Sequence, residues 1–129
     1  MNTKLTDFIE DNLSNIIQKY SEDELYDILD NRDEDDFSDK WMAIYEDLKE
    51  KCKNSKSEKL REIAFKKVNE FSKISDLSSY ISDDFGLFSD AIQIDYQNEW
   101  LNGLWLKYKQ MEIPNKDVEE INGRLEDIL

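Results

Sequence analysis

Apolar residues recur at helical spacing along nearly the whole chain, and no segment of useful length shows the alternation of a strand. Residues three or four positions apart lie on one face of an α-helix. The first such stripe consists of Leu5, Phe8, Ile9, Leu13, Ile16, Ile17 and Tyr20. Only three Gly and one Pro are present in 129 residues to interrupt helices. The sequence therefore predicts an all-α fold.

The length of 129 residues is typical of one domain. We expect a single acidic helical domain over residues 1–129, built as an irregular bundle of roughly six to eight short helices. A solenoid-like stack of helical hairpins is the alternative architecture.

Breaks between the first three helices are expected on both sides of residues 21–32. Ser21 lies three residues before Glu24, the pattern of a capping box, and a short helix follows it. The run 33–36 consists of four adjacent carboxylates, which repel one another and bury no apolar surface, so we expect a loop there. Ser38 or Asp39 is then expected to cap a third helix, whose apolar stripe runs from Trp41 to Cys52.

Further helices are expected over residues 60–74, 83–92, 96–110 and 118–128, with a short helical turn beginning at Asp76. Ser82 or Asp83 is expected to cap the helix over 83–92. The apolar residues of that segment fall on several sides, so it is predicted to be the most buried helix. Pro114 is expected to end one element or begin the next.

Several kinds of chemistry are disfavoured by what the composition lacks. The chain contains no His, the commonest general base and a frequent metal ligand, and its one Cys permits neither a disulfide framework nor a Cys-rich zinc site. Three Gly are too few for a phosphate-binding loop. An EF-hand beginning at Asp33 would have Phe37 and Ile44 at ligand positions. We expect no catalytic residues, no metal site and no cofactor.

Three other features are better explained by structure than by chemistry. The adjacent carboxylates Asp83-Asp84 and Glu119-Glu120 are acid–base candidates by type alone, but neighbouring residues on a helix do not face each other. Cys52 lies on an apolar stripe and is expected in the core. The seven-residue spacing of Lys59, Lys66 and Lys73 indicates a solvated helix face.

Neither a secretory signal nor a membrane span is apparent, since Asp7, Glu10 and Asp11 interrupt any apolar run near the N-terminus. The lone Cys is typical of a reducing compartment, and we expect a cytoplasmic protein.

The main functional signal is negative charge. The formal net charge is -14, and residues 1–50 hold 16 acids against 5 bases. A dense field of one sign steers partners of the opposite sign and opposes nucleic-acid phosphates. The predicted contact surface for a basic partner consists of Asp27, Asp30, Asp33, Glu34, Asp35, Asp36 and Asp39. Trp100 and Trp105 are added as candidate aromatic contacts, since Trp is enriched at binding hot spots.

These features favour a non-enzymatic acidic binding protein. The leading hypothesis is an immunity protein or inhibitor that neutralises a basic partner such as a bacterial toxin nuclease, because small acidic inhibitors of such toxins share this charge and size. One alternative is a DNA-mimic inhibitor of a defence enzyme, of the anti-restriction or anti-CRISPR type. Another is a helical adaptor whose charge serves solubility. Direct binding to nucleic acid or to a membrane is not expected.

Overall fold

The computed structural model describes residues 3–129, and over this range the chain is all-helical with no strand, as the sequence predicts. A first helix runs through α1 (Thr3–Phe8), a π-helical segment η1 (Ile9–Leu13) and α2 (Ser14–Gln18) without leaving helical backbone angles. It is followed by α3 (Glu22–Arg32), α4 (Asp35–Lys51), α5 (Glu58–Ser72), α6 (Ser75–Ile94), α7 (Glu99–Lys109) and a 3-10 turn η2 (Leu125–Ile128).

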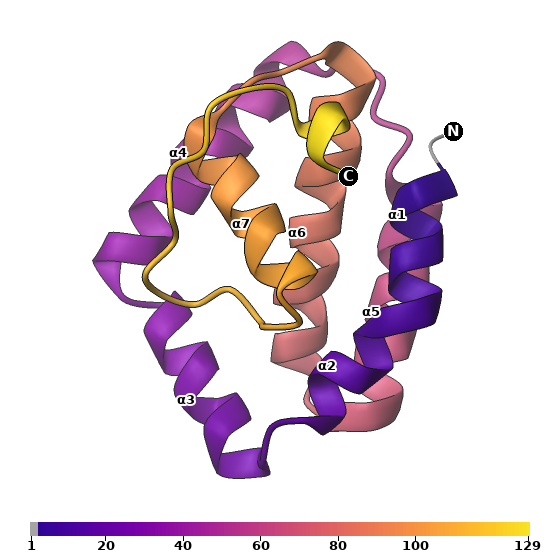
Figure 1. Ribbon diagram of the computed structural model, residues 1–129, viewed down its shortest axis with the longest axis vertical. Coiled ribbons are helices and arrows are strands. Elements are labelled where there is room, and N and C mark those ends of the chain that lie inside the picture. The colour runs from indigo at the N-terminus through magenta and orange to yellow at the C-terminus, as the bar shows by residue number, and fades with distance from the viewer. Residues whose placement is uncertain (1–2) are drawn as a thin grey trace.

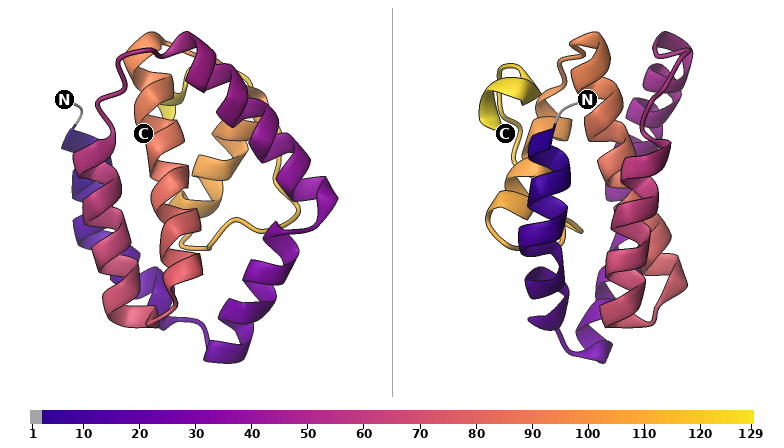
Figure 2. Two further views of the ribbon diagram at one scale, coloured as in Figure 1. Left: turned by 180° about the vertical axis from the view of Figure 1, so that it is seen from behind. Right: turned by 90° about the vertical axis from the view of Figure 1, so that its right-hand side faces the viewer.

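The helices form a bundle around α6. Helix α5 packs along α6, and the first helix packs against α5 (Figures 1 and 2). Helices α3 and α4 follow each other along the opposite side of the molecule, and α7 lies between them and α6 in the view of Figure 1. All helices contribute to one hydrophobic cluster, which distinguishes this bundle from a solenoid, where each hairpin contacts only its neighbours.

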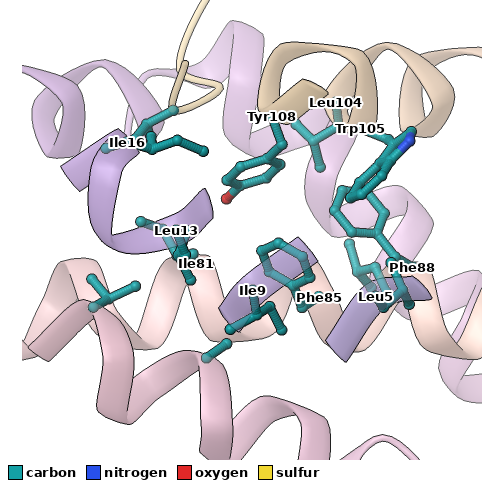
Figure 3. Packing of buried hydrophobic residues seen from close by; sticks show 14 of the residues in the cluster. Leu5, Ile9, Leu13, Ile16, Ile81, Phe85, Phe88, Leu104, Trp105 and Tyr108 are labelled. Atoms are coloured by element: carbon teal, nitrogen blue, oxygen red, sulfur yellow. The ribbon is translucent and has the colours of Figure 1, made fainter. Parts of the chain in front are cut away.

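The centre of the core lies where α6 meets α7 and the first helix (Figure 3). Phe85 and Phe88 of α6 are fully buried and contact the rings of Trp105 and Tyr108 of α7. Helix α6 contributes more buried residues than any other helix in the described range, and residues 84–88 are all buried. The 83–92 segment is therefore central to the core, but it is part of the longer α6, and α7 buries at least as large a share of its residues, so the prediction that 83–92 is the most buried helix is not confirmed.

Two predicted helix boundaries are wrong. Helix α6 is continuous, and the hydroxyl of Ser82 donates to the carbonyl oxygen of Arg61 instead of capping a new helix. The acidic run is not a four-residue loop, because α3 ends at Arg32 and α4 already begins at Asp35. Carboxylates in the first turn of a helix interact favourably with its dipole, so Asp35 and Asp36 are accommodated within α4. The capping box of Ser21 and Glu24 is present as predicted.

The expected helix over 118–128 is also wrong, since only η2 is helical there. The segment from residue 110 to residue 124 forms an irregular strap that passes over α7 (Figure 1). The amide of Asn102 donates to the carbonyl oxygens of Ile121 and Gly123, and the Ile121 N–H donates to the carbonyl of Glu99. These bonds to α7 replace hydrogen bonds that a helix would have formed within the segment.

The strap depends on a close approach at Gly103 of α7. A Cβ atom at this position would lie 1.7 Å from the carbonyl oxygen of Glu119 and 2.9 Å from a Val118 methyl carbon. We therefore expect Gly103→Ala to displace the strap and to lower the free energy of unfolding by about 1–3 kcal/mol, the usual cost of overpacking. Denaturant unfolding gives the energy, and faster amide exchange at Ile121 reports the displacement.

Gly86→Ala is the matched control, because a Cβ there meets only the side chain of Arg61, which can move aside. Alanine is also favoured over glycine inside a helix, so this variant should be as stable as the parent. Equal stability of the Gly103→Ala variant and the parent would contradict the close approach.

Candidate functional site

The turn between α3 and α4 gathers exposed carboxylates on one side of the bundle. Asp27 and Asp30 lie on α3, Asp33 and Glu34 form the turn, and the remaining acids lie on the first turns of α4. We call this set the acidic turn face: Asp27, Asp30, Asp33, Glu34, Asp35, Asp36 and Asp39. All seven side chains are exposed, as predicted, and they lie within the short stretch 27–39.

A patch of large apolar side chains continues from this face along α4. Met42 is 44% exposed and Tyr45 is 39% exposed. The half-buried ring of Trp41 stacks on Tyr45, with 5.5 Å between centroids and 15° between planes. We call Trp41, Met42 and Tyr45 the α4 aromatic patch. Exposed groups of this kind are typical of protein contact surfaces.

Tyr45 falls within the predicted apolar stripe from Trp41 to Cys52, and Met42 was not predicted to lie at a contact surface. The bundle covers one side of α4 and buries Ile44 and Leu48 there. The apolar stripe from Trp41 to Cys52 is wider than this covered side. That width was the available signal, since the outer members of a wide stripe remain exposed. Phe37 is buried and packs edge-on against Trp100, so it is not part of the patch.

A surface cavity of about 270 Å³ lies where the acidic turn face, the patch and α6 meet. Its walls come from α3, the turn, α4 and α6, and consist of Arg32, Asp33, Phe37, Ser38, Trp41, Met42, Tyr80 and Asp83. The cavity therefore brings together acids and aromatic rings from segments that are distant in sequence.

Beneath the cavity lies a buried ion pair between Arg32 and Asp84. The two guanidinium nitrogens of Arg32 lie 2.8 and 2.7 Å from the two carboxylate oxygens of Asp84. Asp84 also accepts hydrogen bonds from Trp41 Nε1 at 2.9 Å and from the Tyr108 hydroxyl at 2.6 Å. Arg32 donates in addition to the carbonyl of Pro114. The network joins α3, α4, α6 and α7 and holds the indole of Trp41 in place.

The network lies in the buried interior of the bundle. Burial raises the pKa of Tyr108 well above its usual value, and the charge of Asp84 adds to this effect. Burial alone would lower the pKa of Arg32, but the adjacent carboxylate of Asp84 outweighs burial and raises it. Arg32 therefore stays cationic with its charge matched by Asp84. Such a pair is a structural element and not an acid–base couple.

The Arg32–Asp84 pair was not predicted, although both helices carry a sequence signal for it. Asp84 lies at helical spacing from Leu77, Ile81 and Phe88, so it is an acid on an apolar face. Arg32 extends the stripe of Ile28 and Leu29 by one turn. A charge at a core position is expected to be paired. Asp83, by contrast, is only half-buried, and so the two neighbours occupy different surroundings.

The two candidate indoles of α7 lie in the core. Trp100 is 7% exposed and packs against Phe37, while Trp105 is 2% exposed and donates through Nε1 to the carbonyl of Ile128. Helix α7 is covered by the bundle on one side and by the strap on another, so a wide face is buried and both indoles fit on it. We therefore correct the prediction that Trp100 and Trp105 contribute to an exposed contact surface.

Other groups singled out by sequence also have structural surroundings. Cys52 is buried, and burial raises the pKa of its thiol, so the predicted core position is confirmed. Lys66 pairs with Glu62 on the exposed face of α5. Within residues 3–129, no group of three or more His, Cys, Asp or Glu residues is arranged to hold a metal ion. None of the helices in that range has the length and apolar character needed to cross a membrane.

Comparison with known proteins identifies the family. None of the curated proteins compared with this sequence matches it. Residues 4–115 match the family described as Immunity protein PIM1, which covers the helices from α1 to α7 and the start of the strap. The match includes the acidic turn face, the α4 aromatic patch and the Arg32–Asp84 pair. Because it spans most of the 129 residues, the chain belongs to the PIM1 family of immunity proteins.

Proposed function

We propose that this protein is a non-catalytic inhibitor that neutralises a basic bacterial toxin by binding it through the acidic turn face and the α4 aromatic patch. The observation that carries the proposal is membership of an immunity protein family, since immunity implies a protein partner. Family membership supports this function over an adaptor or a DNA mimic of a defence enzyme. It supports a binding role over an enzymatic one in the same way.

Charge favours a basic partner. With a net charge of -14 and seven exposed acids around one turn, the protein attracts cationic surfaces and accelerates encounter with them. A toxin that cleaves nucleic acid presents such a surface, because it must bind phosphates. We therefore propose a nuclease as the toxin and its cationic substrate groove as the surface that is covered.

Charge alone does not provide high affinity. Exposed ion pairs contribute about 0.2–1 kcal/mol each, whereas aromatic residues in the centre of an interface contribute more. Met42 and Tyr45 are exposed next to the acids, and Trp41 is held by its bond to Asp84. A pre-organised ring loses little conformational entropy on binding. The patch thus supplies the apolar centre and the acids supply the rim.

The experiment is a pull-down from the native host with the parent and with a turn variant. The turn variant carries Ser at Asp33, Glu34, Asp35 and Asp36. We expect the parent to retain a basic protein at low salt and to release it at about 0.5 M salt. At that salt concentration the Debye length is roughly 4 Å, so charges that are farther apart are screened from each other. The turn variant should fail to retain it at low salt, and co-expression of the variant should no longer protect cells from the toxin.

A charge-matched control separates a specific surface from overall charge. It carries Ser at four exposed acids on other parts of the molecule: Asp7, Glu70, Glu119 and Glu120. This control should bind like the parent. Equal binding of the turn variant and the parent would refute the acidic turn face as the contact surface, and loss of binding in both variants would show that only net charge matters.

A further inference from the structure

The cavity beneath the acidic turn face has two carboxylates in its walls that come from different elements. Asp33 belongs to the turn between α3 and α4, and Asp83 belongs to α6. Trp41, Met42 and Tyr80 supply the apolar and aromatic parts of the wall. Its volume of about 270 Å³ lies below the roughly 300–1,000 Å³ of small-molecule pockets, so it is sized for part of a ligand, such as one side chain.

The walls are already in position without a partner. The Tyr80 hydroxyl donates to Asp33 at 2.6 Å, and this bond is the main reason why the pKa of Tyr80 is raised. Trp41 is oriented by its hydrogen bond to Asp84. A ligand that enters the cavity therefore contacts side chains that the fold has already ordered, so they lose little conformational entropy on binding.

The charges in the walls favour a cation. Arg32 also contributes to the walls, but its charge is matched by the buried carboxylate of Asp84. Asp33 accepts one hydrogen bond from a neutral phenol. Asp83 has an ion-pair contact to Arg61 that is 4.0 Å long, at the limit for such a contact. Both carboxylates thus have room for a further donor.

The aromatic groups favour a guanidinium over an ammonium. The guanidinium carbon of Arg32 lies 4.7 Å from the Phe37 ring centroid and 5.5 Å from that of Tyr80, so these two rings are already occupied by one planar cation, and Trp41 is the aromatic side chain of the wall that remains for a ligand. A second guanidinium can stack on an aromatic side chain and donate to two carboxylates in fixed directions, which a compact ammonium group cannot do as well.

We infer that this cavity receives an arginine side chain of the partner, which donates to Asp33 and Asp83 and packs against Trp41 and Met42. The inference rests on the proposed function for the source of that arginine. The capacity of the cavity can be tested without the toxin, so failure of this inference and failure of the proposed function are distinguishable.

The experiment is an NMR titration of the full chain with N-acetyl-arginine amide. Citrulline and lysine analogues are the matched probes, since citrulline keeps the shape without the charge. Signals of the Trp41 indole N–H and the Met42 methyl group should shift saturably with the arginine probe, at least threefold more weakly with lysine, and not with citrulline. Asp33→Asn and Asp83→Asn should each weaken arginine binding by about two- to fivefold, as expected for one exposed ion pair.

Glu70→Gln is the control variant, because it removes one exposed acid from α5, away from the cavity, and should leave arginine binding unchanged. Equal shifts with citrulline would overturn the inference, as would equal affinity for lysine. Shifts confined to Asp35, Asp36 and Asp39 would overturn it as well, because they would indicate diffuse attraction to the surface. An absence of saturable shifts at Trp41 and Met42 would have the same consequence.

Discussion

Asp84→Ala is expected to lower the free energy of unfolding by about 3–5 kcal/mol, because it leaves the buried guanidinium of Arg32 without its counter-charge. The substitution also removes the acceptor for Trp41 Nε1 and for the Tyr108 hydroxyl. Denaturant unfolding measures the loss. Changed tryptophan fluorescence of the folded variant would report the altered surroundings of Trp41.

Asp83→Ala is the control within the same helix. Burial raises the pKa of Asp83, so its charged form gains little from the fold, and this variant should lie within about 1 kcal/mol of the parent. The double variant Arg32→Met/Asp84→Leu should recover part of the stability, because an apolar pair of similar size needs no counter-charge, whereas Trp41 Nε1 and the Tyr108 hydroxyl still lack their acceptor. A loss below about 1 kcal/mol for Asp84→Ala would contradict the importance of the pair.

Phe88→Ala should also lower the free energy of unfolding by about 3–5 kcal/mol, the range for removing a fully buried ring. Phe88 is 0% exposed, and its centroid lies 5.4 Å from those of Phe85 and Trp105. The cavity left by the ring would be enclosed by large side chains, which cannot easily fill it. Thermal and denaturant unfolding both measure the effect.

Phe71→Ala is the matched control, since this ring lies on α5 and is 38% exposed. It should cost less than about 1 kcal/mol, because surface substitutions have small effects. Similar losses for the two phenylalanines would show that Phe88 is not at the centre of the core.

Local sequence patterns were sufficient for the secondary structure where the signal lay within one helix. The apolar period identified the helical segments, and the pair Ser21 and Glu24 identified the start of α3. The error at residues 118–128 occurred where tertiary contacts decided the outcome. Backbone carbonyl groups of the strap accept hydrogen bonds from the Asn102 side chain of α7. The apolar pattern of residues 118–128 contains no information about contacts with α7.

The acids of the turn face could be placed on the surface from sequence because four adjacent carboxylates cannot all be buried. The rest of the candidate site required the fold. Asp33 and Asp83 line one cavity although 50 positions separate them in the numbering. Which members of the α4 stripe remain exposed depended on how much of that helix its neighbours cover.

The sequence by itself determined the helical class, the negative charge and the exposure of the acids, since these follow from side-chain periodicity and from the cost of burying charge. Only the tertiary structure decided that Trp100 and Trp105 are buried, that Arg32 pairs with Asp84, and that Trp41, Met42 and Tyr45 lie at the surface. The physical reason is that burial and pairing depend on which faces meet. That choice is made by the packing of the whole bundle and is not encoded within any one helix.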